Sequence, residues 1–176
     1  MIDKQNFNIL VLDQATISAG ICVVNVKDGQ PIWTYCVRWG MNESDYEERM
    51  KQLYEKVKNL IHEHNIDILI LEDVPPIMKN FHSTSVLLKL LGVLQLAGKQ
   101  EGIQTVLMNV RKWKSLANIK AKGRPAQKKE SIILACERWQ EFKTIIAKCD
   151  DVADCLNMSY AYLVDKGYIP KEKNKK

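Results

Sequence analysis

Asp67-Ile-Leu-Ile-Leu-Glu72 is the stretch that decides the fold, because four apolar residues follow one another between two acids. A short, continuous apolar run is typical of a strand that is covered on both faces, as the strands of a parallel sheet are. The following Pro75 and Pro76 end the strand. The stretch therefore predicts a buried strand inside a sheet.

Helices are predicted on both sides of this strand. Before it, apolar residues recur at spacings of three and four from Tyr46 to Ile61, and Ser44 with Glu47 matches a capping box. After it, the segment Val86–Lys99 is apolar almost all round, so we expect it to bury more than one face. This burial fits a central core helix, a subunit interface, or both.

The rest of the chain extends the sheet. The N-terminal part predicts an antiparallel meander with an Asp28-Gly29 hairpin signal, and its strands are Phe7–Asp13, Ile21–Val26 and Ile32–Trp39. The C-terminal part predicts a strand at Gln104–Met108, a basic loop at Ala117–Pro125, and helices at Val110–Leu116, Gln127–Glu141 and Asp151–Lys166. We therefore expect an α/β fold with a central five-stranded mixed sheet flanked by helices.

Length and composition limit the class of protein. We expect a single domain over residues 1–168 and a basic, disordered tail over residues 169–176. The apolar fraction of 46% and the charged fraction of 27% are globular values. Five scattered cysteines without a Cys-x-x-Cys pair predict reduced thiols in the cytoplasm. The sequence shows neither a secretion signal nor an apolar run of roughly 18 residues, so we expect no membrane partner.

Positive charge gathers between residues 111 and 130, which hold eight Lys or Arg against one acid, Glu130. Such a basic face suits a polyanion, because neutralised phosphates release counterions. Solvated lysines that flank helices would give the same pattern. The candidate DNA-binding residues are Arg111, Lys112, Lys114, Lys120, Lys122, Arg124, Lys128 and Lys129.

Four carboxylates interrupt apolar elements, where a charge is costly unless it is paired or bound to a cation. Asp13 closes the first strand, Glu72 closes the fourth, and Asp151 and Asp154 share one face near the start of the last helix. If the two strands are neighbours, all four side chains meet in one pocket. Taken alone, Asp13 could simply end a strand, and Asp151 and Asp154 could be first-turn acids that the helix dipole favours. The combination of all four in one chain favours a metal site.

An all-oxygen pocket without His or Cys suits Mg²⁺, with Mn²⁺ able to replace it. Two such ions, about 3.5 to 4 Å apart, can activate a water and stabilise the leaving oxygen in phosphodiester hydrolysis. We therefore predict phosphoryl-transfer chemistry with two ions per active site. The neighbouring Asp73 and Asp150 are interpreted as solvent-facing or capping residues.

These residues resemble the pattern of the RuvC-type Holliday junction resolvases, which belong to the RNase H-like superfamily. Over nearly the whole chain the order matches: a first strand ending in Asp, a fourth ending in Glu, and the late motif Asp151-Val-Ala-Asp-Cys-Leu156. The resemblance implies that Asp13, Glu72, Asp151 and Asp154 are the metal ligands of an endonuclease that cuts four-way or branched DNA. It also implies a cytoplasmic protein, in a bacterial cell or in a host cell infected by a phage or virus.

The resemblance assigns further roles. The segment Val106–Lys114 is similar to the strand and short helix that deliver a basic residue to the scissile phosphate, which makes Lys114 catalytic. The segment Gly123–Glu130 is similar to the one that brings a second lysine, and its register favours Lys128 over Lys129. The helix around Val86–Ala97 would be the dimer helix, and a two-fold homodimer presents two active sites to two symmetry-related strands.

Two positions depart from the family's pattern. Asp13-Gln-Ala-Thr replaces the Asp-Pro-Gly turn that is common in bacterial members, which changes the backbone beside the metal ligands. Val74-Pro75-Pro76 stands where familiar members carry an aromatic that enters the junction, and the nearest aromatic is Phe81. The second departure bears on junction opening and on sequence preference.

Three other functions agree with parts of the sequence. A catalytically silent protein that binds branched DNA would keep the basic face, but the four carboxylates argue against it. A sugar-kinase or actin-like ATPase would need a second, glycine-rich phosphate loop, which the sequence lacks. An RNase H-like nuclease that acts on RNA or RNA-DNA hybrids shares the metal chemistry and is the main alternative.

Overall fold

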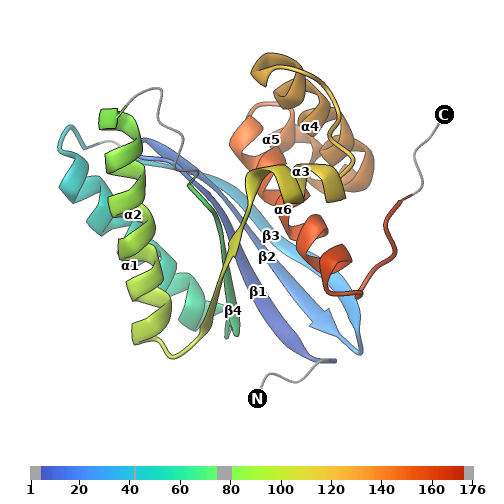
Figure 1. Cartoon of the computed structure of the whole chain (residues 1–176). Coiled ribbons are helices and arrows are strands. Elements are labelled where there is room, and N and C mark those ends of the chain that lie inside the picture. Colours follow the sequence, from blue (N-terminus) through green and yellow to red (C-terminus); the bar gives the residue numbers. More distant parts are fainter. Residues whose placement is uncertain (1–4, 42, 75–80, 173–176) are drawn as a thin grey trace.

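The computed structural model describes residues 5–41, 43–74 and 81–172, and its centre is one mixed sheet between two helical layers (Figure 1). The strand order in the sheet is β3-β2-β1-β4-β5. The strands are β1 (Phe7–Gln14), β2 (Ser18–Lys27), β3 (Gln30–Gly40), β4 (Ile68–Glu72) and β5 (Gln104–Met108). The predicted α/β fold with a central five-stranded mixed sheet is confirmed.

β1 is the central strand, because it pairs antiparallel with β2 and parallel with β4. Its side chains alternate between two cores: Ile9 and Val11 face one helical layer, and Leu10 and Leu12 face the other. All four are fully buried. β4 is buried over Ile68–Leu71, as its apolar run predicts, and pairs in parallel with β5. The carboxyl ends of β1, β4 and β5 therefore lie at one edge of the sheet.

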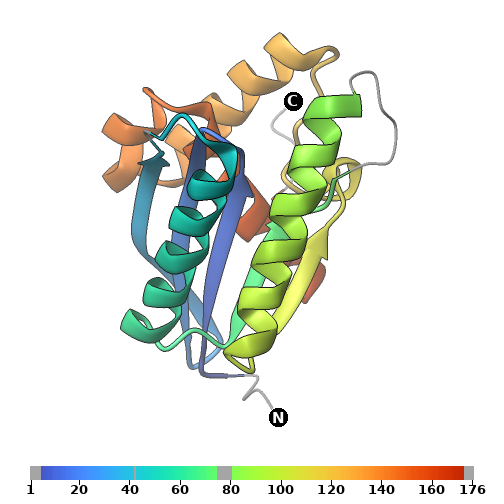
Figure 2. The ribbon, with the colours of Figure 1, turned by 90° about the vertical axis from the view of Figure 1, so that its left-hand side faces the viewer.

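The helices cover the two faces of the sheet separately, as Figures 1 and 2 show. On one face lie α1 (Tyr46–Glu63) and α2 (Phe81–Gln100), which pack against each other. On the other face lie α3 (Val110–Leu116), α4 (Arg124–Arg138), the 3-10 turn η1 (Gln140–Phe142), α5 (Lys143–Ile146) and α6 (Asp150–Asp165). α6 is the core helix of this layer, since every residue from Val152 to Leu163 except Asp154 is buried.

The helices α1, α2 and α4 have other boundaries than predicted. The N-cap of α1 is Asp45, whose carboxylate accepts the backbone N–H of Glu47 at 3.2 Å, so the capping box that begins at Ser44 is wrong. α2 begins earlier than predicted, at Phe81. α4 begins inside the predicted basic loop, at Arg124. The proline in its first turn favours this start, because the first N–H groups of a helix have no partner within the helix and proline has no N–H. α4 then ends before η1, and α5 was not predicted.

α2 buries one side in this chain and exposes the other. Leu90 and Leu94 are buried in the core, whereas Phe81, Leu88 and Leu96 are 73%, 45% and 53% exposed. Within the described part of the chain, α2 alone is long and apolar enough to cross a membrane by length and composition, and 28% of that span is buried. The second apolar face predicted for this helix thus lies uncovered in the single chain.

The segment after α6 includes the predicted disordered tail. Ile169 packs against the core between the sheet and α6, and the Glu172 carboxylate accepts a hydrogen bond from Arg138 at 2.8 Å. Residues 169–172 are therefore held to the domain by contacts. The remainder of the predicted tail, residues 173–176, lies outside the described residues.

β2 approaches α6 closely at Gly20. A Cβ atom built on Gly20 would lie 2.0 Å from the carbonyl oxygen of Asp151 and 2.9 Å from the amide nitrogen of Val152. Gly20 is also the cross-strand partner of Asp13. Because only glycine leaves space for another backbone here, this contact sets the start of α6 beside the end of β1.

We predict that Gly20→Ala lowers the free energy of unfolding by at least about 3 kcal/mol, because the methyl group must push α6 away from the sheet. Denaturant unfolding of the purified variant measures the loss. Gly40→Ala is the matched control, since a Cβ at Gly40 meets no atom within 4 Å, and its stability should stay within about 1 kcal/mol of wild type. Equal stability of the two variants would contradict the close contact.

Candidate metal centre

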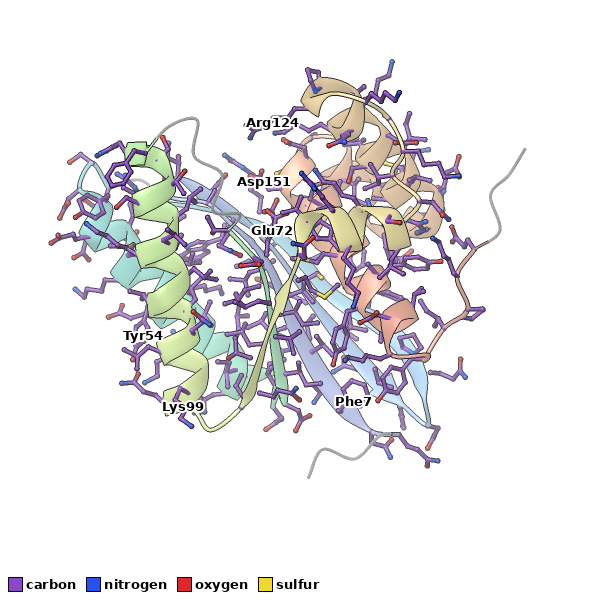
Figure 3. The ribbon with its side chains drawn as sticks, in the orientation of Figure 1. Phe7, Tyr54, Glu72, Lys99, Arg124 and Asp151 are labelled. Atoms are coloured by element: carbon purple, nitrogen blue, oxygen red, sulfur yellow. The ribbon has the colours of Figure 1, made fainter. Side chains whose placement is uncertain are left out.

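The four acids predicted as ligands come from three elements at one end of the sheet. Asp13 lies one residue before the end of β1, Glu72 is the last residue of β4, and Asp151 and Asp154 lie in the first turns of α6. Asp13 and Glu72 reach the same edge because β1 and β4 are parallel neighbours. Figure 3 shows Glu72 and Asp151 toward this end of the molecule and Phe7 at the other.

Burial and mutual repulsion act on these carboxylates together. The pKa of Asp13 is raised well above its ordinary value, chiefly by burial and then by the negative charges of Glu72, Asp154 and Asp151. Burial is also the main cause that raises the pKa of Glu72 and of Asp154. Buried carboxylates that repel one another favour a bound proton or a bound cation. The charges of Glu72, Asp154 and Asp151 thus all act on Asp13.

Hydroxyl groups from two other elements orient the acids of α6. Ser18, at the start of β2, donates from Oγ to Asp151 Oδ2 at 2.8 Å. Ser131, in α4, donates from Oγ to Asp154 Oδ1 at 2.5 Å. The second bond lowers the pKa of Asp154 against the effect of burial. Each acid therefore has one oxygen held by a neighbour.

Glu72 is fixed through its side chain and through its backbone. The indole N–H of Trp113, a buried residue of α3, donates to Glu72 Oε1 at 3.0 Å. The side-chain amide of Gln14 donates to the backbone carbonyl of Glu72 at 2.5 Å, and its oxygen accepts the backbone N–H of Glu72 at 3.1 Å. The backbone pairing of β1 with β4 ends at Leu12 and Leu71. The side chain of Gln14 therefore continues the hydrogen bonding to the next residue of β4, Glu72.

The four residues that hold the acids were not predicted from the sequence; they are Gln14, Ser18, Trp113 and Ser131. The three polar ones are nearly inaccessible, with exposed fractions of 7%, 8% and 1%. A buried polar side chain requires a partner, but these partners lie in distant parts of the chain. For two of them the sequence contains a hint, because Gln14 directly follows Asp13 and Trp113 directly precedes Lys114, and both neighbours were predicted site residues.

Three basic residues lie close enough to influence the acids. The charge of Lys114 lowers the pKa of both Glu72 and Asp154. Arg124 lowers the pKa of Glu72, and Lys128 lowers that of Asp154. Figure 3 shows Arg124 on the same side of the molecule as Glu72 and Asp151. The site is therefore a group of acids bordered by cations, which suits a phosphate bound beside a metal ion.

The predicted DNA-binding residues do not all lie near the four acids. Lys128 forms an ion pair with Asp150, the first residue of α6, whereas Lys129 is exposed, so the structure brings Lys128 to the acids. Lys112 instead pairs with Asp165 at the far end of α6, at 2.8 Å, and is directed away from them. The remaining candidates, Arg111, Lys120 and Lys122, are exposed on α3 and the loop before α4.

The donor set fits a hard divalent cation. Among the described residues, no three His, Cys, Asp or Glu side chains lie close enough to enclose an ion as they stand. The four carboxylates nevertheless offer oxygen alone, and the carboxylate of Asp13 accepts no hydrogen bond from another described residue. A divalent cation would neutralise the repulsion at Asp13. Oxygen donors suit Mg²⁺ or Mn²⁺ rather than a soft metal.

Comparison with known proteins identifies the fold. No protein-family model and no curated protein sequence matches the chain. Among solved structures, RuvC from Thermus thermophilus in complex with its Holliday junction substrate is similar, with a TM-score of 0.69 and 13% identity over 92% of this chain and 97% of that one. The chain has the RuvC-type resolvase fold.

Two other resolvases share this fold. The fowlpox virus resolvase, solved with Holliday junction DNA, has a TM-score of 0.64 and 18% identity, covering 90% of this chain and 98% of that one. The yeast mitochondrial Holliday junction resolvase Ydc2 has a TM-score of 0.61 and 17% identity, covering 91% and 79%. The predicted RNase H-like, RuvC-type architecture is confirmed. At these identities the activity has to be argued from the site.

We predict that Asp13→Asn stabilises the metal-free protein at neutral pH. The folded-state pKa of Asp13 lies above its unfolded value, so ionisation at pH 7 destabilises the fold, and the amide removes that charge. The gain should shrink as the pH falls towards about 4, where the wild-type acid is protonated when folded.

Denaturant unfolding in chelator at both pH values measures this difference. Glu55→Gln, at an exposed position of α1, removes one charge outside the cluster and should leave stability nearly unchanged. A variant that is no more stable than wild type at pH 7 would contradict the repulsion at Asp13.

Proposed function

We propose that this chain is a divalent-metal-dependent endonuclease that resolves Holliday junctions and related branched DNA by paired phosphodiester hydrolysis as a dimer. The observation that carries the proposal is the coupled cluster of Asp13, Glu72, Asp151 and Asp154 at one edge of a RuvC-type sheet. Residues 1–168 would form one nuclease domain. It would act in the cytoplasm of a bacterial cell or of an infected host cell.

The four acids would hold two Mg²⁺ ions, and Mn²⁺ would replace them. When bound, such ions activate a water and stabilise the leaving oxygen in phosphodiester hydrolysis. The residues of the chain supply orientation. Ser18, Ser131 and Trp113 each occupy one oxygen of a partner carboxylate, so the acids keep their positions before a substrate arrives. This preorganisation lowers the cost of assembling the site.

The basic residues would engage the substrate. Lys114 lies beside Glu72 and Asp154 and is half-buried, which suits a side chain that contacts the scissile phosphate. Lys128 and Arg124 border the same acids from α4. Their charges attract the DNA backbone without regard to sequence. The proposed selectivity for branched DNA then rests on the arrangement of two sites in a dimer.

The uncovered side of α2 supports a homodimer. Phe81, Leu88 and Leu96 form an exposed apolar stripe on this helix, and a Cβ at Gly92, between the two leucines, would meet no atom within 4 Å. A small residue at the middle of an apolar stripe lets another helix approach closely. A second copy of the chain would cover this stripe and set two active sites across a two-fold axis.

The experiment that tests the function is cleavage of a labelled synthetic four-way junction, beside linear duplex and an RNA-DNA hybrid. Each substrate is incubated with Mg²⁺, with Mn²⁺ and with chelator. We expect paired nicks in the junction with either metal and none with chelator. Asp13→Asn and Asp151→Asn should reduce cutting to the level of the chelator sample, because each removes a metal ligand while the basic face still binds DNA.

The outcomes separate the candidate functions. Normal cutting by either variant would overturn the assignment of the metal ligands. Cutting of the hybrid alone would replace the proposal with an RNase H-like activity on RNA. Tight binding of the junction without any cutting would indicate a silent binding protein.

We predict that Leu88→Glu makes the protein monomeric, because a charge at the centre of the apolar stripe has to be desolvated in the dimer. Light scattering after gel filtration gives the mass. The variant should nick single strands of the junction but lose paired cuts. Ile32→Glu, at a position of β3 that is 53% exposed, is the matched control and should keep the wild-type mass. A dimeric Leu88→Glu variant would refute this interface.

A further inference from the structure

Glu172 makes most of the hydrogen bonds that hold the segment after α6. Its carboxylate accepts hydrogen bonds from the guanidinium of Arg138, the shortest at 2.8 Å. Its backbone carbonyl accepts Asn118 Nδ2 at 3.1 Å, and its backbone N–H donates to the hydroxyl oxygen of Tyr160 at 2.9 Å. Arg138 lies over the ring of Tyr160, 4.2 Å from the ring centroid, and its side chain is only 7% exposed. These contacts fix one point of the C-terminal segment against α4 and α6.

The anchor positions the preceding residue, Lys171, at a pocket. Lys171 Nζ donates to the backbone carbonyl of Ser115 at 2.9 Å. The pocket has a volume of about 520 Å³ and lies between α3, the loop that follows it and α4. Arg111, Lys114 and Lys120 also line it, and none of the described residues in its lining is acidic. Four cations in one concave surface repel one another unless an anion joins them.

We propose that this pocket binds a backbone phosphate of the DNA strand next to the cleavage site, with Lys171 as one of its ligands. The inference rests on the proposed nuclease function and extends the DNA surface to the C-terminal segment. It also explains the contacts of Glu172, because they keep Lys171 at the pocket.

Lys114 connects this pocket with the candidate metal centre. It lines the pocket, its Nζ donates to Gln127 Oε1 at 3.2 Å, and it lies 5.4 Å from the ring centroid of Trp113. Trp113 in turn donates to Glu72. A strand whose scissile phosphate lies at the acids would therefore have a neighbouring phosphate within reach of the pocket. The hydroxyl of Ser115 and the amide of Asn118 add neutral polar groups to the lining.

The test is the salt dependence of junction binding, measured by fluorescence anisotropy in chelator so that no cleavage occurs. Lys171→Ala should weaken binding and reduce the slope of log K against log salt by about 0.9, the value for one lost phosphate contact. Lys171→Arg should restore the slope. Lys27→Ala is the matched control, since Lys27 is exposed at the end of the sheet opposite Asp13, and it should bind like wild type.

Glu172→Ala separates the anchor from simple charge. Removing an acid near a DNA-binding face should raise affinity if only net charge matters. If Glu172 instead positions Lys171, the variant should lose affinity and show a slope as shallow as that of Lys171→Ala. Thermal unfolding of each variant checks that the domain remains folded under the binding conditions.

The outcomes are distinguishable from failure of the proposed function. A Lys171→Ala slope equal to that of Lys27→Ala, in a protein that binds and cuts junctions, would overturn the pocket assignment alone. Higher affinity of Glu172→Ala would overturn the anchoring role. Calorimetry with inorganic phosphate distinguishes the source of the ligand: saturable binding that Lys171→Ala abolishes, with an unchanged DNA slope, would replace the DNA strand by a free phosphate. A wild-type protein that binds no DNA would overturn both proposals.

Discussion

At Gly20 the backbone of β2 lies so close to the backbone of α6 that no side chain would fit between them. Because Gly20 has no side chain, the start of α6 lies against β2, directly across from Asp13. This approach lets α6 bury its length in the core and delivers Asp151 and Asp154 to the edge where β1 and β4 end. This contact therefore bears both on the packing of α6 and on the position of its two acids.

The same packing makes the acidic cluster costly. Burial raises the pKa of Asp13, Glu72 and Asp154, and their mutual repulsion adds to it. The neighbours compensate in part, since hydroxyl and indole donors each hold one carboxylate oxygen. A site that keeps unfavourable charges in a defined geometry gives up stability for function. A bound divalent cation would offset this repulsion.

Local patterns in the sequence predicted the elements but not the contacts between them. The apolar run Asp67–Glu72 indicated a buried strand, and the positions of the acids at strand ends indicated a shared edge; both are local signals. Gln14 and Ser131 hold acids that lie far away in the chain, so no local pattern could reveal them. The N-cap of α1 is Asp45 rather than the predicted Ser44, one residue away, because backbone geometry sets where the helix begins.

The position of α6 in the chain also bears on how the protein is made. Two of the four acids lie in strands β1 and β4, whereas the other two lie in the last helix. During synthesis β1 and β4 leave the ribosome before α6. A nascent or truncated chain then carries half of the candidate centre. The candidate centre is therefore complete only once the helix that carries Asp151 and Asp154 has been made.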